Sequence, residues 1–590
     1  MSIKNTPLAA LLVALFLFVL SSCKSDTPVE GTDTSTDISG IDFKRTENIV
    51  SVRLPDEPNY LSPVITTQAY ARYVHEYIFQ TLNHMDLQTF ELTPMLAGLP
   101  EVSEQEDGTI LHRYQLDERA TWPNGSPVTT ADVVFSLKLL LNPKVEAGAV
   151  RSFYQDVTDM IIEDERSFSI QTGQVYILTD YALASLYVYP EYAYDPEGLL
   201  SEFTVAELAN AENAAQLAEN DDRLETFAQV FQDFEMTHNP DNIVGSGAYK
   251  LDSWEPQQRL ILSKRDDYWA EGSDNPALKA LPDGMEFEII PDAQTAVVAL
   301  QDELVDVVVD MDPERFVSLR QDEAMVEKFS FSTEPGFGMY SIIINSDDPM
   351  LSDAGTRRAL AHLMDVDLLN EEYYNGMGKR SSNPVLPAQT YYDESLALID
   401  FNVEEAERLL AEAGWIDSDG DGTLDRDGQD FELEFLTFST PIGEAISQLL
   451  REGCQQVGIN VTTEAMGGRA LYGKLNEGDF QSATYAQGYQ PHPDEFSQSW
   501  LTTSVPPGGT NRGRFGDEES DALINKIRVT TDAEERAELY KQMQGIFYRE
   551  TPQIPLFSPL MRIVVSKRFE VETGSITPGF SLDNFVHLQE

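Results

Sequence analysis

The chain has 590 residues and a formal net charge of −60, with 100 Asp and Glu against 40 Lys and Arg. This excess of acid argues against a nucleic-acid binder, because such proteins neutralise phosphates with clustered Lys and Arg. It also argues against docking on an anionic bilayer through a basic patch. The hydrophobic fraction of 42% and the aromatic fraction of 10% are enough for a large core. The composition therefore predicts a large, acidic, folded protein.

The N-terminus carries an apolar run, Leu8–Leu20, that ends shortly before Cys23. This run is too short to span a hydrocarbon core of about 30 Å, but it fits the apolar region of a secretory signal peptide. The residues before the Cys resemble a bacterial lipobox, in which cleavage leaves the Cys as a lipidated first residue. We predict a signal peptide over 1–22, lipidation of Cys23 and a flexible tether over 23–41. The alternative is an ordinary signal peptide with an incidental Cys.

The rest of the chain is predicted to lie in the cell envelope, on the periplasmic side or the outer surface. No later segment approaches 18 consecutive apolar residues, so the lipid is the only expected contact with the membrane. Cys23 and Cys454 are the only cysteines, so lipidation of the first leaves no intramolecular disulfide. Cys454 lies in an amphipathic stretch and is predicted to be a buried structural thiol.

Helical and strand patterns alternate along the body from about residue 41. The predicted elements, in chain order, are a strand over 49–54, a strand over 109–116, a helix that Thr129 and Asp132 cap and Asn142 ends, a helix over 201–231, a hairpin over 248–263, a helix over 402–413, a strand over 431–438, helices over 443–456 and 532–547, and strands over 554–557 and 562–565. This interleaving predicts the α/β class.

Motifs of the common enzyme classes are missing from the sequence. It contains no G-x-S-x-G, no phosphate-binding P-loop and no H-E-x-x-H. The seven His are scattered, and no two have the spacing of metal ligands. We therefore predict that the protein is not an enzyme and requires no cofactor.

One acidic stretch has the spacing of a calcium-binding loop. Carboxylates at positions 1, 3, 5 and 9, with a Gly at position 6, match an EF-hand-type loop. The Glu expected at position 12 is replaced by Gly428. The two interpretations are a structural Ca²⁺ site and a solvated turn. The candidate ligands are Asp417, Asp419, Asp421, Thr423 and Asp425.

Several segments resemble, in the same order, the signatures of the bacterial extracellular solute-binding proteins of the peptide/nickel class, family 5. These proteins are the capture components of ABC importers. The segments are 114–134 (YQLDERATWPNGSPVTTADVV), 245–249 (GSGAY), 268–269 (YW), 291–306, 358–365, 406–415 (AERLLAEAGW) and 552–557 (PQIPLF).

The resemblance implies a two-lobed periplasmic-binding-protein fold with an extra inserted domain and hinge-linked lobes around a ligand cleft. It implies a discontinuous lobe I (42–66, 186–306 and 555–590), an inserted small domain (67–185) and a lobe II (307–554). The protein would be a monomer that captures an oligopeptide or a related organic solute by hinge closure. It would then deliver this ligand to the permease subunits of an ABC importer.

The resemblance also indicates positions that contact ligand. Peptide binders of the family hold the peptide's α-amine with an Asp, but Gly488 occupies the matching position here, so the charge partner is missing. The aromatic residues Tyr485, Tyr489 and Trp500 would suit stacking on an apolar or planar group. Further candidates by position are Thr66, Thr67, Phe153, Tyr154, Tyr340 and Arg380.

Alternatives remain open for the ligand and for the function. An oligopeptide is the default ligand, a non-peptide organic solute is the main rival, and nickel binding through His492 is a weaker third. The same scaffold would also serve a ligand-sensing or chaperone-like binding protein. An extracytoplasmic hydrolase would need a nucleophile or a carboxylate pair that converges in the cleft.

Overall fold

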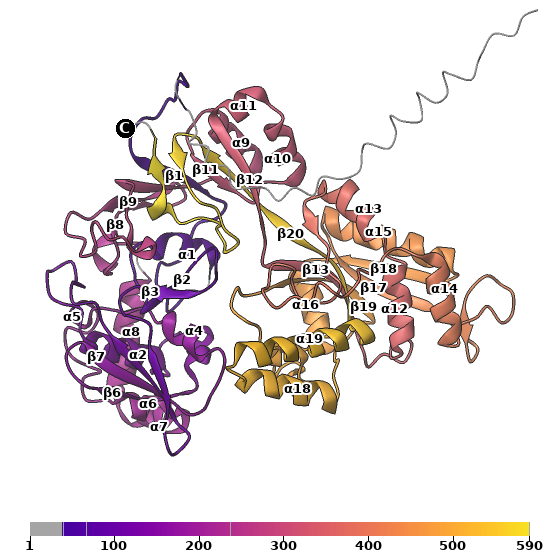
Figure 1. Cartoon of the computed structure of the whole chain (residues 1–590), viewed down its shortest axis with the longest axis horizontal. Helices are drawn as coiled ribbons and strands as arrows, with labels where there is room; N and C mark the ends of the chain where they lie inside the picture. The colour runs from indigo at the N-terminus through magenta and orange to yellow at the C-terminus, as the bar shows by residue number, and fades with distance from the viewer. Residues whose placement is uncertain (1–37, 39, 67, 237, 589–590) are drawn as a thin grey trace, which may run out of the picture. The chain divides into compact units, whose positions relative to one another are not determined.

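The computed structural model describes residues 38, 40–66, 68–236 and 238–588 (Figure 1). Residues 41–590 form one compact unit. The predicted signal peptide, Cys23 and nearly all of the predicted tether lie outside the described residues. Within the described part, no helix has the length and apolar character needed to cross a membrane.

A twelve-stranded mixed sheet forms the centre of this unit. Its strands are β1 Ile49–Leu54, β8 Tyr249–Glu255, β9 Arg259–Lys264, β10 Gly284–Ile289, β11 Val307–Val309, β12 Phe329–Pro335, β13 Gly338–Ile344, β14 Gly378–Lys379, β17 Glu432–Phe438, β18 Asn460–Met466, β19 Ser482–Gly488 and β20 Gln553–Ser566. They follow the order β18-β17-β19-β13-β20-β11-β1-β10-β9-β8, and β12 and β14 pair with β20 off this path. Parallel pairs (β1 with β10, β17 with β18) occur beside antiparallel ones, as in mixed α/β folds.

The long strand β20 pairs with different strands at its two ends (Figure 1). Its first residues pair with β13, and its last residues pair with β11 and β12. The sequence pattern suggested two short strands, because Pro559 cannot donate a backbone hydrogen bond. The ladder nevertheless continues, since Pro559 pairs opposite Gly378 and the next N–H, of Leu560, donates to the carbonyl of Met377 at 2.8 Å. Only Pro559 and Leu560 are less than fully buried in this strand.

A separate four-stranded antiparallel sheet belongs to the predicted inserted domain. In spatial order its strands are β4 Glu101–Glu104, β5 Ile110–Gln115, β7 Ser167–Thr172 and β6 Val157–Ile162. The helix α2 Thr130–Leu141 begins at the predicted capping box, in which the Asp132 carboxylate accepts from the N–H of Thr129 at 2.8 Å. Asp132 also accepts from the indole N–H of the buried Trp122, so one carboxylate ties the preceding turn to the helix.

Helices pack around these sheets (Figure 1). The others are α1 Ala69–His75, α3 Gly148–Arg151, α4 Thr179–Ala184, α5 Glu191–Tyr194, α6 Val205–Ala209, α7 Ala211–Asn220, α8 Asp222–Glu235, α9 Ala293–Gln301, α10 Pro313–Arg320, α11 Glu323–Lys328, α12 Ala354–His362, α13 Val366–Leu368, α14 Val403–Glu412, α15 Pro441–Gln456, α16 Gly468–Glu477, α17 Ser497–Trp500, α18 Glu518–Val529 and α19 Ala533–Glu550. The helix predicted over 201–231 is three helices, because Asn210 and Asp221 each start a new helix by accepting from its first N–H groups.

Two large hydrophobic cores lie in this unit. The first includes Val52 of β1 and Phe168 of β7, so the four-stranded sheet and β1 share one core. The second is built from residues between Ile342 and Phe557. Strands β11 and β12, which the predicted boundary at 307 assigned to lobe II, pair with the C-terminal half of β20. The domain boundaries themselves stay predictions.

The Gly378→Ala substitution is expected to destabilise the region where β20 changes partners. A Cβ at Gly378 would lie 2.6 Å from both the Phe557 ring and the Asn370 side chain, and the Asn370 amide is held by two hydrogen bonds to Gly378. We expect a loss of about 1–3 kcal/mol in unfolding free energy, measured as a lower Tm.

The matched control is Gly473→Ala in α16, where a new Cβ meets no atom within 4 Å. Removing this helical Gly is expected to add up to about 1 kcal/mol of stability. Equal melting of the two variants would contradict the close packing at Gly378.

Candidate functional site

The strand β19 ends at Gly488, the position where the sequence lacks the expected Asp. Side chains of this strand are buried at its start and become exposed toward Gly488. Gly488 pairs with Gly338 of β13, and a Cβ built on it meets no atom within 4 Å. The backbone here therefore faces open space, and it presents no charge of its own.

The two tyrosines beside Gly488 differ in role. Tyr485 is 5% exposed, and its hydroxyl accepts from Arg512 at 3.1 Å while its ring contacts Tyr472. It belongs to the packing of lobe II. Tyr489 is half-buried, and its hydroxyl donates to the carbonyl of Pro384 at 3.0 Å. Burial raises the pKa of Tyr489 well above its ordinary value, so it is a fixed neutral phenol at this edge.

Two aromatic contacts join the predicted inserted domain to residues of the predicted lobe II. The ring of Phe90 meets that of Phe337 edge-on at 5.5 Å, and the carbonyl of Phe337 accepts from the N–H of Tyr489. The ring of Tyr181 lies 5.5 Å from that of His492. Sequence reasoning missed Phe90 and Tyr181, because nothing local marks a contact between residues so far apart in the chain.

The remaining predicted positions are spread over the molecule. Tyr154 is 4% exposed in the first core, whereas its neighbour Phe153 is 59% exposed. The Arg380 guanidinium is paired with Asp367 at 2.9 Å and Asp400 at 3.0 Å, so it already has anionic partners. The structure therefore does not bring Phe153 or Arg380 to Gly488 through any contact in the described part of the chain.

Trp500, Thr66 and Tyr340 have structural contacts of their own. The Trp500 ring packs 4.4 Å from that of Phe547 in a buried cluster. Thr66 lies in the loop after β1, with its N–H on the carbonyl of Ser62. Thr67 lies outside the described residues. Tyr340 is half-buried beside Phe557 of β20, at 5.6 Å between ring centroids.

A charged pair that sequence reasoning missed lies where β20 changes partners. Arg562 places a guanidinium nitrogen 3.7 Å from Asp310 and lies 5.6 Å from the centre of the Tyr374 ring. Asp310 has a positive φ of 52°, and its side chain is 58% exposed. Desolvation by the surrounding protein nonetheless raises the pKa of Asp310, against the opposing charge of Arg562. The signal that could have found this pair is a lone Arg inside the apolar run Met561–Val565.

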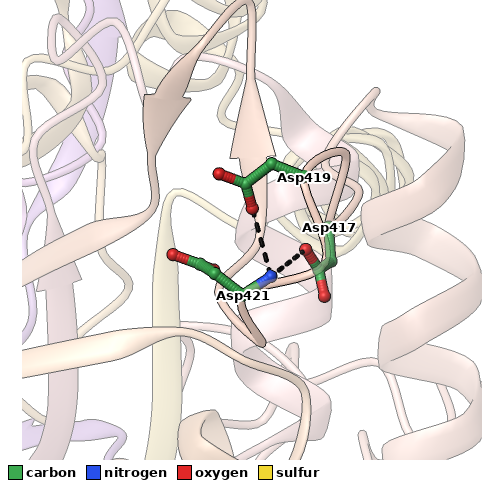
Figure 2. A group of neighbouring side chains, drawn as sticks. All are labelled: Asp417, Asp419 and Asp421. Atoms are coloured by element: carbon green, nitrogen blue, oxygen red, sulfur yellow. Dashed lines mark hydrogen bonds between the residues drawn. The ribbon is translucent and has the colours of Figure 1, made fainter.

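The acidic loop brings three of its five candidate ligands together (Figure 2). Oxygen atoms of Asp417, Asp419 and Asp421 all lie within 4.8 Å of one another, and the side chains are exposed. The N–H of Asp421 donates to the carboxylates of both other residues at 3.1 Å. Asp425 instead accepts from the N–H and the hydroxyl of Ser418, which lowers the pKa of Asp425.

Thr423 is linked to the same loop through its N–H, which donates to Asp421 at 2.8 Å.

Cys454 lies in the helix α15 and is a free, fully buried thiol. Burial raises the pKa of Cys454 to about 12, so it is an unreactive structural residue, as predicted.

Comparisons with known proteins agree with this architecture. The model of a family described as "Bacterial extracellular solute-binding proteins, family 5 Middle" matches residues 91–507. The oligopeptide-binding protein AppA of Bacillus subtilis is 23% identical over 526 residues, which cover 87% of each chain. The dipeptide-binding protein of Escherichia coli is 23% identical over 492 residues, 81% of this chain and 83% of its own.

A solved structure shows the same fold. NikA from Brucella suis in complex with Fe(III)-EDTA matches with a TM-score of 0.72 at 18% identity, over 91% of this chain and 99% of that chain. Together with the mixed sheet and its two cores, this likeness establishes the α/β, two-lobed periplasmic-binding-protein fold.

The loop that carries Thr66 rests on a buried carboxyl group whose ionisation is expected to make stability depend on pH. Glu235 ends α8, and burial raises the pKa of Glu235 to about 7, against hydrogen bonds from Ser62 and Tyr194 that lower it. Folding thus favours the protonated form. The stability from this group is fully present below the unfolded pKa of about 4.5 and is lost as pH rises through about 7.

The Glu235→Gln variant is expected to gain stability over the natural protein as pH rises from 5 to 8, by at most about 3 kcal/mol. Melting temperatures at several pH values would measure this gain. Glu219→Gln, at an exposed position of α7, is the control and should shift nothing. A Glu235→Gln gain that is the same at pH 5 and pH 8 would refute the buried-carboxyl explanation.

Proposed function

Because the chain belongs to the bacterial extracellular solute-binding proteins of family 5, we propose that it captures an oligopeptide or a related organic solute by hinge closure. Proteins of this family are the extracytoplasmic binding components of ABC importers, and this chain is such a transport protein rather than an enzyme. The captured ligand is handed to the membrane permease of the importer, and the binding protein acts as a monomer.

The observation that carries this proposal is the course of β20. The strand pairs with β13 at one end and with β11 and β12 at the other, and only Pro559 and Leu560 between them are partly exposed. A ligand that contacts both lobes stabilises the closed arrangement over the open one, and a short segment of this kind absorbs the backbone change.

Lipid on Cys23 holds the protein at a membrane of the cell envelope. This part of the proposal rests on the sequence, in which a signal-peptide-like run ends just before Cys23 and a Ser-, Thr- and Asp-rich tether follows. The lipid would keep the binding protein near its permease without a membrane-spanning helix.

The ligand group that lies at Gly488 has no carboxylate to pair with at that position. A Cβ built on Gly488 meets no atom within 4 Å, and the N–H of the neighbouring Tyr489 donates to Phe337, whose ring contacts that of Phe90. Aromatic surfaces favour an apolar or planar group. A peptide ligand would therefore be held without an ion pair between its α-amine and residue 488. A non-peptide organic solute would fit the same surroundings.

A thermal-shift screen of peptides and organic solutes tests this function. Any true ligand at 100 times its Kd is expected to stabilise the folded protein by about 2.7 kcal/mol, because it binds only the native state. Acetylating the amine of a peptide ligand should change its effect little in the natural protein. In Gly488→Asp, the new carboxylate should favour the free amine by about tenfold in Kd.

The variant has room for its side chain, because no atom lies within 4 Å of the added Cβ. Its unliganded Tm should therefore match that of the natural protein. If no peptide or solute in a broad screen raised the Tm, and mass spectrometry found nothing bound to the purified protein, solute capture would be ruled out.

We also propose that residues 417–423 hold a structural Ca²⁺ ion. The support is the group of Asp417, Asp419 and Asp421, whose oxygen atoms lie close enough to share one ion. Oxygen ligands of this kind are those that Ca²⁺ prefers. The ion would neutralise three exposed carboxylates in one loop and would fix that loop beside α14, with no part in ligand capture.

Removing calcium tests this second proposal. We expect Ca²⁺ to raise the Tm relative to EDTA and to bind with a stoichiometry of one in calorimetry. Asp417→Asn and Asp419→Asn should abolish both effects, whereas Asp430→Asn, on the exposed strand β16 Gln429–Asp430, should keep them. Identical melting in Ca²⁺ and EDTA, with no heat of binding, would show that the loop is a solvated turn.

A further inference from the structure

The segment between β7 and α4 belongs to the predicted inserted domain but packs against residues of lobe II. Ile177 is 8% exposed and belongs to a hydrophobic cluster whose other buried members all come from residues 385–547. These members include Phe496, Ile524 and Tyr540. Ile177 is thus the only buried residue of that cluster, among those described, that lies before residue 385. Its side chain therefore packs against residues from a later part of the chain.

Polar contacts around Ile177 hold it in this hydrophobic cluster. Its N–H donates to the carbonyl of Arg528, at the end of α18, at 3.0 Å. The guanidinium of Arg528 lies 5.5 Å from the centre of the Tyr176 ring, and its Nε is 2.7 Å from a carboxylate oxygen of Glu495. Arg528 therefore lies between an aromatic ring of the inserted domain and a carboxylate of lobe II, a geometry that stabilises the cation on both sides.

A second acid also lies near this arginine. The charge of Arg528 lowers the pKa of Asp156, whereas burial raises it more strongly, and Asp156 precedes β6 in the inserted domain. Arg528 thus has anionic neighbours from both sides of the junction. The ring contact between Tyr181 and His492 lies just beyond, four residues after Ile177.

We propose that Tyr176, Ile177 and Arg528 form a clasp that locks the inserted domain onto lobe II when the lobes close. Within the described part of the chain, none of the contacts of these three residues reaches Gly488, and the clasp holds the closed arrangement without any ligand contact of its own. It rests on the hinge closure proposed above and adds a device that sets the balance between open and closed forms. A protein with this clasp populates the closed form before ligand arrives, and it releases bound ligand slowly.

The clasp is built to separate. Lobe II keeps its own large core, and the inserted domain shares its core with β1, so opening would expose Ile177 and the adjacent Leu178 and leave both large cores intact. The side chain of Arg528 is 32% exposed, so water can solvate it when Tyr176 withdraws. Interfaces of this limited, mixed polar and apolar kind are typical of domains that move relative to each other.

Distance measurements on the ligand-free full chain test the clasp. Labels are attached at Glu106→Cys, on the exposed β4–β5 turn, and at Glu534→Cys, on the exposed start of α19. Cys23→Ser leaves Cys454 as the only other cysteine, and Cys454 is too buried to react. We expect a single short-distance population in the natural background. Ile177→Asp should raise the ratio of open to closed molecules by about tenfold or more.

Arg528→Met removes the lobe II member of the clasp and should also populate the longer distance. The double variant should open no further than the stronger single variant, because both residues serve one contact. The matched controls are Ile162→Asp, at a 55% exposed position of β6, and Arg469→Met, at an exposed position of α16. Both should keep the natural distance distribution.

If both clasp variants fold, as judged by circular dichroism, and keep the natural distribution, the clasp is refuted. If Ile177→Asp fails to fold, Arg528→Met decides alone. Because no ligand enters this experiment, its outcome is separate from that of the solute screen. Opening by the clasp variants together with a failed screen would keep the clasp and reject solute capture.

Discussion

The continuity of β20 is the constraint on which the rest of the molecule depends. Fourteen residues form one strand that belongs to two differently built parts of the same sheet. Each end is fixed by its own ladder, and the last part is pinned by Arg568, just after the strand, which is fully buried and pairs with Asp306 at 2.7 Å. Within this strand, a movement between the lobes would bend the backbone near Pro559 and Leu560, its two partly exposed residues. The close approach of Gly378 to Phe557 limits that movement to a narrow part of the strand.

The large negative charge is compatible with this fold because many of its acids perform local structural work. Among the described residues, eight helices begin at an Asp whose carboxylate accepts hydrogen bonds from the first turn, where the helix dipole favours negative charge. These are Asp221, Asp292, Asp312, Asp322, Asp353, Asp365, Asp517 and Asp532. These acids thus place part of the negative charge at helix starts, where it is stabilising. It does not supply a carboxylate at Gly488, where the ligand chemistry depends on one position.

The sequence predicted local elements well and long-range contacts poorly, for a physical reason. The Thr129–Asp132 capping box and the helix over 402–413 depend on residues within one turn of each other, so their signals are local. The single strand β20 depends on partners hundreds of residues away, which continue its ladder past Pro559. The same holds for Ile177, because its partner Arg528 lies hundreds of residues later in the sequence. No periodicity records such a pair.

The candidate site shows the same division between what a residue type suggests and what its surroundings decide. Trp500 and Tyr485 were predicted to contact ligand because they are aromatic, yet Trp500 packs in a buried cluster and Tyr485 is held by Arg512. Burial is the commonest use of a large ring, since it removes the most apolar area from water. Gly488 was singled out because it stands where the family's peptide binders have an Asp, and a Cβ built on it meets no atom within 4 Å. At this site the missing carboxylate is therefore more informative than the aromatic residues around it, because it specifies which ligand charge finds no partner there.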